Sequence, residues 1–172
     1  KSNFENKLIL KIMKKITFFI LFLLFSISSN AQEFQWVKQI AGTTATPFSV
    51  KINDLVYDRD EKIVVCGSFS GTVDFDPTSA INNRTANGTD GFVAYYNGGG
   101  ELLWIHTTNE SGNEEFSAGI INYGSAYTRR FTGVVTKGTN SFYLRALNLN
   151  DGTVFTSTTT YTSTGTVKIN DI

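Results

Sequence analysis

Two aspartates at alternate positions, Asp74 and Asp76, have the spacing in this chain best suited to metal binding. Side chains two residues apart in an extended strand point to one face, so both carboxylates could bind a hard cation such as calcium. Calcium takes about 6 to 8 oxygen ligands, and two carboxylates supply only part of that set. Asp76 also precedes Pro77, and such an aspartate commonly opens a turn. We therefore favour a structural turn, keep calcium at Asp74 and Asp76 as the alternative, and expect no other cofactor.

Two further groups of acidic residues could in principle carry acid–base chemistry. Asp58 and Asp60 flank an arginine in a short polar stretch that is typical of a solvated turn. Glu110, Glu114 and Glu115 form an acidic connection close in sequence to the single histidine. Paired carboxylates can hydrolyse a glycosidic bond, but a solvated loop explains this connection better. Neither group predicts a catalytic site.

The single histidine, His106, and the single cysteine, Cys66, complete the reactive side chains. His106 has no second metal ligand and no nucleophile in a recognisable setting, so packing or surface exposure is favoured over catalysis. Cys66 lies in an apolar run, which is typical of a small buried residue. One cysteine cannot form an internal disulfide, so the core must hold the fold together. We predict no catalytic residues and a protein that is not an enzyme.

The beginning of the chain has the layout of a secretory signal peptide. Met13 opens a segment with two lysines, an apolar run over residues 16–27 and a small-residue end at Ala31, after which we expect cleavage. The apolar run is shorter than the roughly 20 residues of a membrane span, so we expect no stable span after cleavage. Residues 1–12 precede this segment, and we interpret them as upstream, non-native sequence. The prediction is an exported protein, secreted or at the cell surface, with a signal peptide over 13–31.

Charge gives no indication of nucleic acid as a partner. The 172 residues carry 15 basic and 15 acidic side chains. Removal of residues 1–31 takes away five lysines and one glutamate, which leaves ten basic and fourteen acidic side chains. A mildly acidic protein is a poor binder of phosphate backbones.

Internal repetition is the strongest feature of the remaining sequence. Trp36 aligns with Trp104, residues 69–73 align with 131–135, and Phe92 aligns with Phe142. Lys51-Ile-Asn-Asp-Leu55 returns as Lys168-Ile-Asn-Asp-Ile172, which indicates the start of a third copy. Recurrent aromatic positions could stack on sugars, but we expect them in the core between repeats. The repeated structural positions are Trp36, Trp104, Phe69, Gly71, Phe92, Phe131, Gly133, Phe142 and Phe155.

Each copy has the pattern of short strands. The first contains runs rich in β-branched and aromatic residues at 50–57, 62–69, 92–96 and 102–107, with turn signals at 58–60, 87–88 and 97–100. Four strands joined by tight turns form the blade of a β-propeller. We predict an all-β, propeller-like fold of about two blades with four antiparallel strands each, preceded by the signal-peptide helix. The predicted parts are a lone strand in 32–45, repeat 1 in 46–108, a degenerate repeat 2 in 109–165, and the start of repeat 3 in 166–172.

These residues resemble the secreted bacterial β-propeller repeats called SBBP repeats, which are common in long extracellular proteins of Bacteroidetes. The resemblance rests on residues 36–40, 64–77, 88–94 and 102–104, and it covers about Glu33 to Thr108. Repeat 2 departs from the pattern, because it lacks a counterpart of residues 74–77 and has Phe155 where the pattern has tryptophan. The resemblance implies export and a scaffold, and it implies no activity.

The function that these observations favour is an exported repeat scaffold, a non-catalytic β-propeller for binding or surface display. Its partner would be a glycan or another surface protein. The alternative is that the chain is the N-terminal part of a secreted hydrolase, for example one that acts on glycans, with catalytic residues beyond residue 172.

Overall fold

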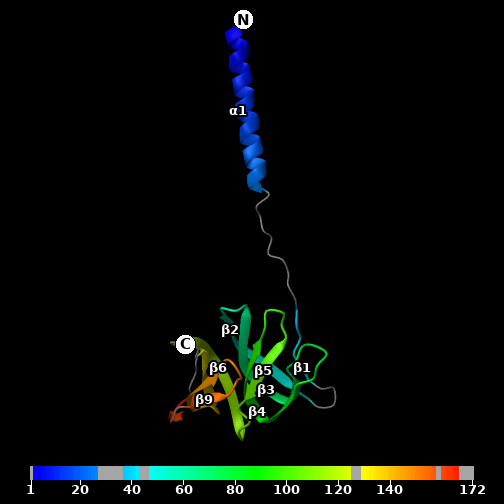
Figure 1. Cartoon of the computed structure of the whole chain (residues 1–172). Coiled ribbons are helices and arrows are strands. Elements are labelled where there is room, and N and C mark those ends of the chain that lie inside the picture. Colours follow the sequence, from blue (N-terminus) through cyan, green and yellow to red (C-terminus); the bar gives the residue numbers. More distant parts are fainter. Residues whose placement is uncertain (1, 27–36, 43–46, 125–128, 158–159, 167–172) are drawn as a thin grey trace. The chain divides into compact units, whose positions relative to one another are not determined.

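The computed structural model describes residues 2–26, 37–42, 47–124, 129–157 and 160–166. The chain divides into two compact units, residues 1–35 and residues 36–172, and each is described by itself (Figure 1). Trp36 and the repeated segment 168–172 lie outside the described residues.

The first unit contains one helix, α1 (Ser2–Ser26). The helix begins at Ser2 and continues through Met13 to Ser26 without a break. Its side chains Lys11, Lys14 and Lys15 interrupt the apolar character of the middle of the helix. Over the described residues, no helix combines the length and the apolar character that crossing a bilayer requires.

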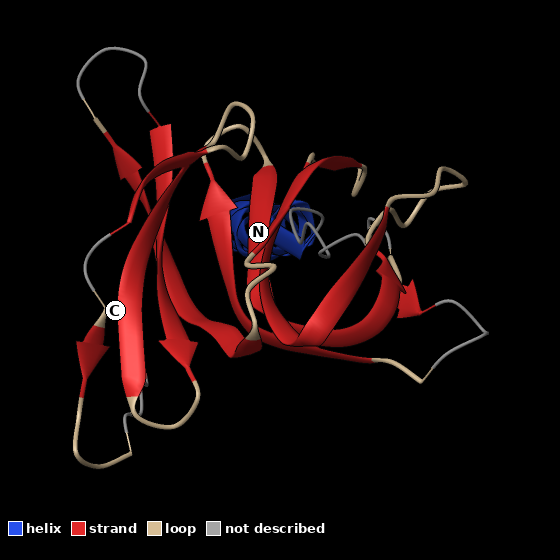
Figure 2. Cartoon of the chain, turned by 90° about the horizontal axis from the view of Figure 1, so that it is seen from below, coloured by secondary structure: helices blue, strands red, loops and turns tan. Residues whose placement is uncertain are grey.

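The second unit is built of β-strands (Figure 2). Its described strands are β1 (Ala41–Gly42), β2 (Ser49–Asp58), β3 (Lys62–Asp74), β4 (Asn83–Tyr96), β5 (Leu102–Thr107), β6 (Gly112–Tyr123), β7 (Arg129–Lys137), β8 (Ser141–Asn148), β9 (Val154–Ser157) and β10 (Tyr161–Thr162). Strands β2 to β5 form an antiparallel meander that we call sheet 1. Strands β6 to β9 form a second meander, sheet 2. The all-β prediction with antiparallel strands is therefore confirmed.

The two sheets share one pattern of pairing. In each, the first and second strands contain a β-bulge, between Ile52 and Asp54 in sheet 1 and between Phe116 and Ala118 in sheet 2. A short parallel bridge from β4 to β6 joins the sheets, and across the described residues the strands do not close into a ring. The finer prediction of propeller blades stays a prediction.

The part of the chain expected to hold a lone strand contains β1, which is short and paired. Ala41 and Gly42 bond antiparallel to Asp74 and Val73 at the far end of β3. At the other end of the unit, β10 pairs with the beginning of β8. Both pairings lengthen the sheets beyond the two meanders.

Two hydrophobic clusters form the core. The first lies between the sheets and combines Val64, Val93 and Tyr95 of sheet 1 with Phe116 and Phe131 of sheet 2, all at most 2% exposed. Burial of one such side chain contributes about 1.5 to 3 kcal/mol. The second cluster lies on the opposite, outer face of sheet 1. The middle strands of sheet 1, β3 and β4, are therefore buried on both faces along most of residues 64–69 and 90–96.

Turn chemistry fixes the hairpins of sheet 1. At the β2–β3 turn, Asp58 accepts the N–H of Arg59 over 2.7 Å, and Glu61 has φ 57°. At the β4–β5 turn, the side-chain oxygen of Asn97 accepts the N–H groups of Gly99 and Glu101 over 3.0 and 2.9 Å. Such side-chain bonds are why asparagine and aspartate favour turns.

All four strands predicted for repeat 1 are present, but two are longer than expected. Strand β3 continues to Asp74, and β4 begins at Asn83. The predicted turn at Asn87-Gly88 is wrong, because both residues lie within β4. Gly88 has φ 90°, and a Cβ there would lie 2.7 Å from the carbonyl oxygen of Gly112. Glycine is needed at this point for the close approach of β6, not for a turn.

Candidate functional site

Titratable side chains gather along the interface between the two sheets, and Asp58 marks one end of it. Asp58 is fully buried. Its carboxylate accepts hydrogen bonds from the hydroxyl of Tyr95 and, over 2.8 Å, from the hydroxyl of Tyr123. Arg129 Nη1 lies 3.0 Å from the same carboxylate. Tyr95 is on sheet 1, whereas Tyr123 and Arg129 are on sheet 2, so this carboxylate links the sheets.

The surroundings of Asp58 keep it ionised. Burial alone would raise the pKa of its carboxyl, because a charge is less stable away from water. Hydrogen bonds from Tyr95, Tyr123 and the Arg59 amide, with the charge of Arg129, outweigh burial and hold the pKa of Asp58 below its ordinary 3.8. Burial and the bond to Asp58 raise the pKa of Tyr95, so its phenol stays protonated and donates. At neutral pH the Asp58 carboxylate is thus ionised and already accepts hydrogen bonds from Tyr95, Tyr123 and Arg129.

The prediction of a solvated turn at Asp58 and Asp60 is half right. The Asp60 side chain is 55% exposed and pairs with Arg129 over 2.7 Å. For Asp58 the prediction is wrong. It failed because the sequence around Asp58 does not reveal that Tyr123 and Arg129, more than sixty residues away, cover the turn.

The middle of the interface is a polar seam between the first strands, β2 and β6. Lys51 Nζ and Asn53 Nδ2 each donate to Glu115 Oε1 over 2.8 Å. Asp54 Oδ2 accepts the backbone N–H of Gly119 over 3.0 Å. Asn53 is the extra residue of the bulge in β2. The bulge thus lets neighbouring residues of one strand bond to the adjacent sheet.

At the other end of the interface, Glu110 gathers three donors from sheet 2. Its carboxylate lies 2.9 Å from each of Lys137 Nζ, the Tyr143 hydroxyl and Arg145 Nη2. Burial would raise the pKa of Glu110, but these three bonds outweigh it and hold the pKa below 4.5. Glu110 follows β5 of sheet 1, so this network also holds the sheets together.

Glu114 is a second buried carboxylate near Glu110. It is fully buried, and its Oε1 lies 3.5 Å from Lys137 Nζ. Neither oxygen has a hydrogen-bond partner among the described residues. Burial raises the pKa of Glu114, and Lys137 only partly offsets this effect. The expectation of a solvated loop is therefore wrong for Glu114, which lies inside β6.

His106 completes this end of the interface from sheet 1. Its Nε2 lies 3.4 Å from Arg145 Nη1, and its ring meets Phe116 edge-on at 6.5 Å between centroids. Burial and the positive charge of Arg145 lower the pKa of His106 to about 4. His106 is therefore a neutral packing residue at physiological pH.

These networks are poorly suited to acid–base catalysis. A general acid needs a raised pKa and a path to substrate. Asp58 and Glu110 have lowered pKa values and several partners each. Glu114 has a raised pKa but no exposed surface. The arrangement instead suits a structural role in which ionised groups join two sheets.

Asp74 and Asp76 hold the loop between β3 and β4. Asp74 Oδ1 accepts the N–H groups of Asp76 and Asn82 over 3.0 and 2.8 Å. Asp76 Oδ1 accepts both the N–H and the hydroxyl of Thr78, over 3.0 and 2.7 Å. These bonds are those of side-chain turns, and they support the turn interpretation. Calcium binding at these residues stays a prediction. Over the described part of the chain, no three His, Cys, Asp or Glu side chains gather as a metal site would require.

The same loop covers the outer face of sheet 1. Phe75 is fully buried, with its ring centroid 4.9 Å from that of Phe92. The Phe75 carbonyl accepts the Tyr96 hydroxyl over 2.9 Å. Residues 74–77 belong to the segment that carries the resemblance to the repeat family. Within them, the Phe75 side chain is part of the second core cluster and covers the outer face of sheet 1.

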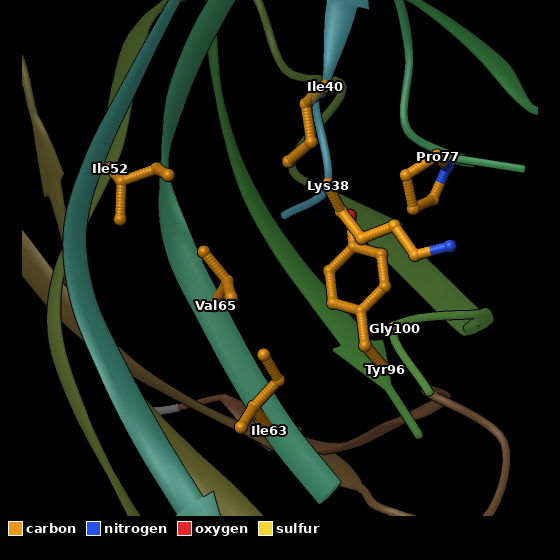
Figure 3. A pocket seen from close by; sticks show the side chains of 8 residues that line it. All are labelled: Lys38, Ile40, Ile52, Ile63, Val65, Pro77, Tyr96 and Gly100. Carbon is orange, nitrogen blue, oxygen red and sulfur yellow. The ribbon is translucent and has the colours of Figure 1, made fainter. Parts of the chain in front are cut away.

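A small apolar pocket remains between this loop, the N-terminal segment and sheet 1 (Figure 3). Its volume is about 120 Å³, little more than a few methyl groups. It is lined by Lys38, Ile40, Ile52, Ile63, Val65, Pro77, Tyr96 and Gly100. The lining is mostly apolar, with Lys38 as its charged member.

Several of the repeated positions lie in the core. Phe69, Phe92 and Phe131 are at most 1% exposed. Gly71 has φ 72° at a bulge in β3 and lies against the backbone of residue 47. A Cβ at Gly133 would lie 2.7 Å from the ring of Phe116, so that glycine makes room for the core between the sheets.

Trp104 contacts both sheets. Its ring packs against Tyr95 at 5.4 Å between centroids, and a Cβ on Gly152 would lie 2.6 Å from it. Its indole N–H donates to the carbonyl of Leu149 over 2.9 Å. Trp104 therefore joins sheet 1 to the β8–β9 turn, and it is half-buried.

Two repeated positions lie elsewhere. Tyr143 faces the core between the sheets, so the adjacent Phe142 points to the outer face, where it stacks on Tyr161 at 5.3 Å. Tyr143, not Phe142, is thus the residue of sheet 2 that matches the buried position of Phe92. Phe155 is 54% exposed, with the guanidinium of Arg130 3.4 Å from its ring centroid. When the two bulges are superposed, strand pairing matches Cys66 with Val134 and Tyr95 with Ala146. The alignment by residue type is therefore off by one in β8 and in β9, where Thr156 and not Phe155 takes the place of Trp104, and off by six between residues 69–73 and 131–135.

No protein-family model, no curated protein and no solved structure matches the chain. The assignment of function consequently rests on the interface geometry. Sequence reasoning missed the main partners in it, Tyr123, Arg129, Lys137 and Arg145. Tyr123, Arg129 and Lys137 are the terminal residues of their strands, where side chains can reach the adjacent sheet, whereas Arg145 lies inside β8 and carries no such signal.

Proposed function

We propose that the protein is an exported, non-catalytic repeat scaffold in which four-stranded sheets stack as propeller-like blades and present a surface for binding or display. The observation that carries the proposal is the interface itself. Its two best-placed carboxylates, Asp58 and Glu110, each accept several donors from the adjacent sheet. Charged groups that hold the two sheets together support the proposal of a scaffold.

The repeated architecture supports the same proposal. Each sheet is a four-stranded meander with a bulge at the same place, and the sheets share a core of aromatic residues. Stacked units of this kind gain stability from the contacts between neighbours. The signal-peptide layout of residues 13–31 supports export.

A test of export and catalysis can use the protein produced by its natural host. We expect it in the cell-surface or culture fraction, with an N-terminus at Gln32. On a panel of polysaccharides, we expect the unmodified protein to show no more turnover than its Asp58→Asn, Glu110→Gln and Glu114→Gln variants. Turnover that one of these substitutions abolishes would contradict the scaffold and favour the hydrolase. A product retained in the cytoplasm would contradict export.

A further inference from the structure

A pocket of about 260 Å³ lies at the end of the interface that Asp58 marks. We call it the junction pocket, because both sheets line it. Sheet 1 contributes Lys62 and Trp104, and the other side is formed by Arg129 and by Asn150 in the β8–β9 turn. Lys62 and Arg129 are the first residues of β3 and β7, and Trp104 lies within β5. Paired strands thus hold most of the lining in place, as a preformed binding site requires.

Two cations in the junction pocket have hydrogen-bond donors that the protein does not use. Arg129 contacts Asp58 and Asp60 through Nη1 alone, and its Nη2 and Nε donate to none of the described residues. Lys62 Nζ has one acidic contact, Asp60 Oδ2 at 3.5 Å, which is long for a hydrogen bond. The two cationic side chains are only 28% and 29% exposed. A carboxylate in the pocket can therefore accept from a planar guanidinium and from an ammonium group.

The charges around the pocket favour an anion as the ligand. Asp58 is fully buried, and its carboxylate already accepts three side-chain donors. Asp60 is 55% exposed, and an ion pair of so exposed an acid contributes little. The cations are Lys62, Arg129 and Arg59, which lies over a tyrosine ring of the same network. With three cations against two acids, an incoming carboxylate can replace Asp60 on Lys62 and Arg129.

The rest of the lining suits a sugar ring. Trp104 is half-buried and lines the pocket beside Leu103, which is 46% exposed. Aromatic and aliphatic surfaces of this kind pack against the C–H groups of a ligand. Asn150 is exposed, and its side-chain amide offers both donors and an acceptor to hydroxyl groups. Pockets for drug-sized ligands have about 300 to 1,000 Å³, so the junction pocket is suited to a single sugar unit.

We propose that the junction pocket binds a uronate residue of an acidic polysaccharide. Its carboxylate accepts hydrogen bonds from Arg129 and Lys62, its ring lies against Trp104 and Leu103, and its hydroxyl groups bond to Asn150. The inference rests on the proposed function and deepens it by naming the class of ligand and its place. A neutral sugar would leave the donors of the two cations unmatched. An acidic peptide would supply the carboxylate but no ring for the apolar surface.

Calorimetric titration of the protein from its natural host tests the proposal. The probes are oligomers of glucuronate, galacturonate and mannuronate. Each is compared with the neutral oligomer of glucose, galactose or mannose with the same linkage, which differs only in the group at C6. We expect at least one uronate oligomer to bind, and its neutral counterpart to bind about tenfold more weakly or less. The affinity for the uronate should fall as the salt concentration rises.

Three substitutions locate the ligand. Lys62→Gln should weaken uronate binding by about tenfold and leave the binding of the neutral oligomer unchanged. Asn150→Ala should weaken the binding of both oligomers. Lys51→Gln is the matched control, because Lys51 also pairs with an acid but lies outside the pocket and is 64% exposed. Its affinity for the uronate should equal that of the unmodified protein. Lys62 and Asn150 are substituted rather than Arg129, because Arg129 also holds the two sheets together.

Four results would overturn the proposal. They are a failure of all three uronate oligomers to bind, equal affinity for the neutral counterparts, uronate binding that neither Lys62→Gln nor Asn150→Ala weakens, and equally tight binding of an oligoglutamate peptide. The third would exclude the pocket, and the fourth would exclude a sugar as the preferred ligand. None of them changes where the protein is found or its turnover of polysaccharides, so a failure here is distinguishable from a failure of the proposed function.

Discussion

Arg129 Nη1 of sheet 2 lies 3.0 Å from Asp58 Oδ2 of sheet 1, and Asp58 has no exposed surface. Residues 71 positions apart in the chain thus form an ion pair at the edge of the core between the sheets. Removal of one partner of a buried pair leaves the other charge or its donors unsatisfied, which is costly. The stability of the interface should therefore depend on this pair.

Asp58→Asn should lower the free energy of unfolding by about 2 to 3 kcal/mol, because Tyr95, Tyr123 and Arg129 lose an ionised acceptor. Asp60→Asn is the matched control. Its side chain is 55% exposed, so we expect a loss below about 1 kcal/mol. Urea unfolding at pH 7 measures both, and equal losses would contradict a special role for Asp58.

Acid should destabilise the protein in two overlapping ranges of pH. The pKa of His106 is lowered from 6.5 to about 4, so its contribution is complete above pH 6.5 and is lost as pH falls toward 4. The pKa values of Asp58 and Glu110 are lowered, so their contributions are complete above the ordinary 3.8 and 4.5 and are lost at lower pH. His106→Gln should flatten only the upper range. Urea midpoints between pH 7 and pH 3 test this, and an unchanged slope in the variant would refute the assignment to His106.

Glu114→Gln should raise the free energy of unfolding at pH 7. The folded state raises the pKa of Glu114, so it holds the protonated form better than the ionised one. A neutral side chain of the same shape removes that penalty. Glu110→Gln should have the opposite effect, because the pKa of Glu110 is lowered. Changes of the same sign in the two variants would show that the electrostatic account of this end of the interface is wrong.

Phe75→Ala should cost about 3 to 5 kcal/mol, because it empties a fully buried site next to Phe69 and Phe92. Ile81→Ala, in the same loop but 77% exposed, should change stability by less than about 0.5 kcal/mol. Thermal unfolding with and without added calcium distinguishes a loop held by the packing of Phe75 from a loop held by a bound metal. If calcium restores the stability of Phe75→Ala, the loop is held by the metal and not by the aromatic ring.

The sequence predicts the strands better than the site. Alternation and turn residues place all four strands of repeat 1, because both depend on local backbone preferences. The interface networks around Asp58 and Glu110 are not predictable in this way. Asp58 and Glu114 have the sequence context of solvated residues, and only the packing of sheet 2 on sheet 1 makes them buried. The one-residue error at Phe142 has a related cause, since alignment by residue type does not detect which face a side chain takes.

Ionised side chains join the two sheets into one structural unit. A double-mutant cycle between Asp58→Asn and Arg129→Gln, followed by urea unfolding at pH 7, measures how strongly this pair couples the sheets. We predict a coupling free energy of about 1 to 3 kcal/mol and a single cooperative transition. Additive losses within about 0.5 kcal/mol would contradict the claim.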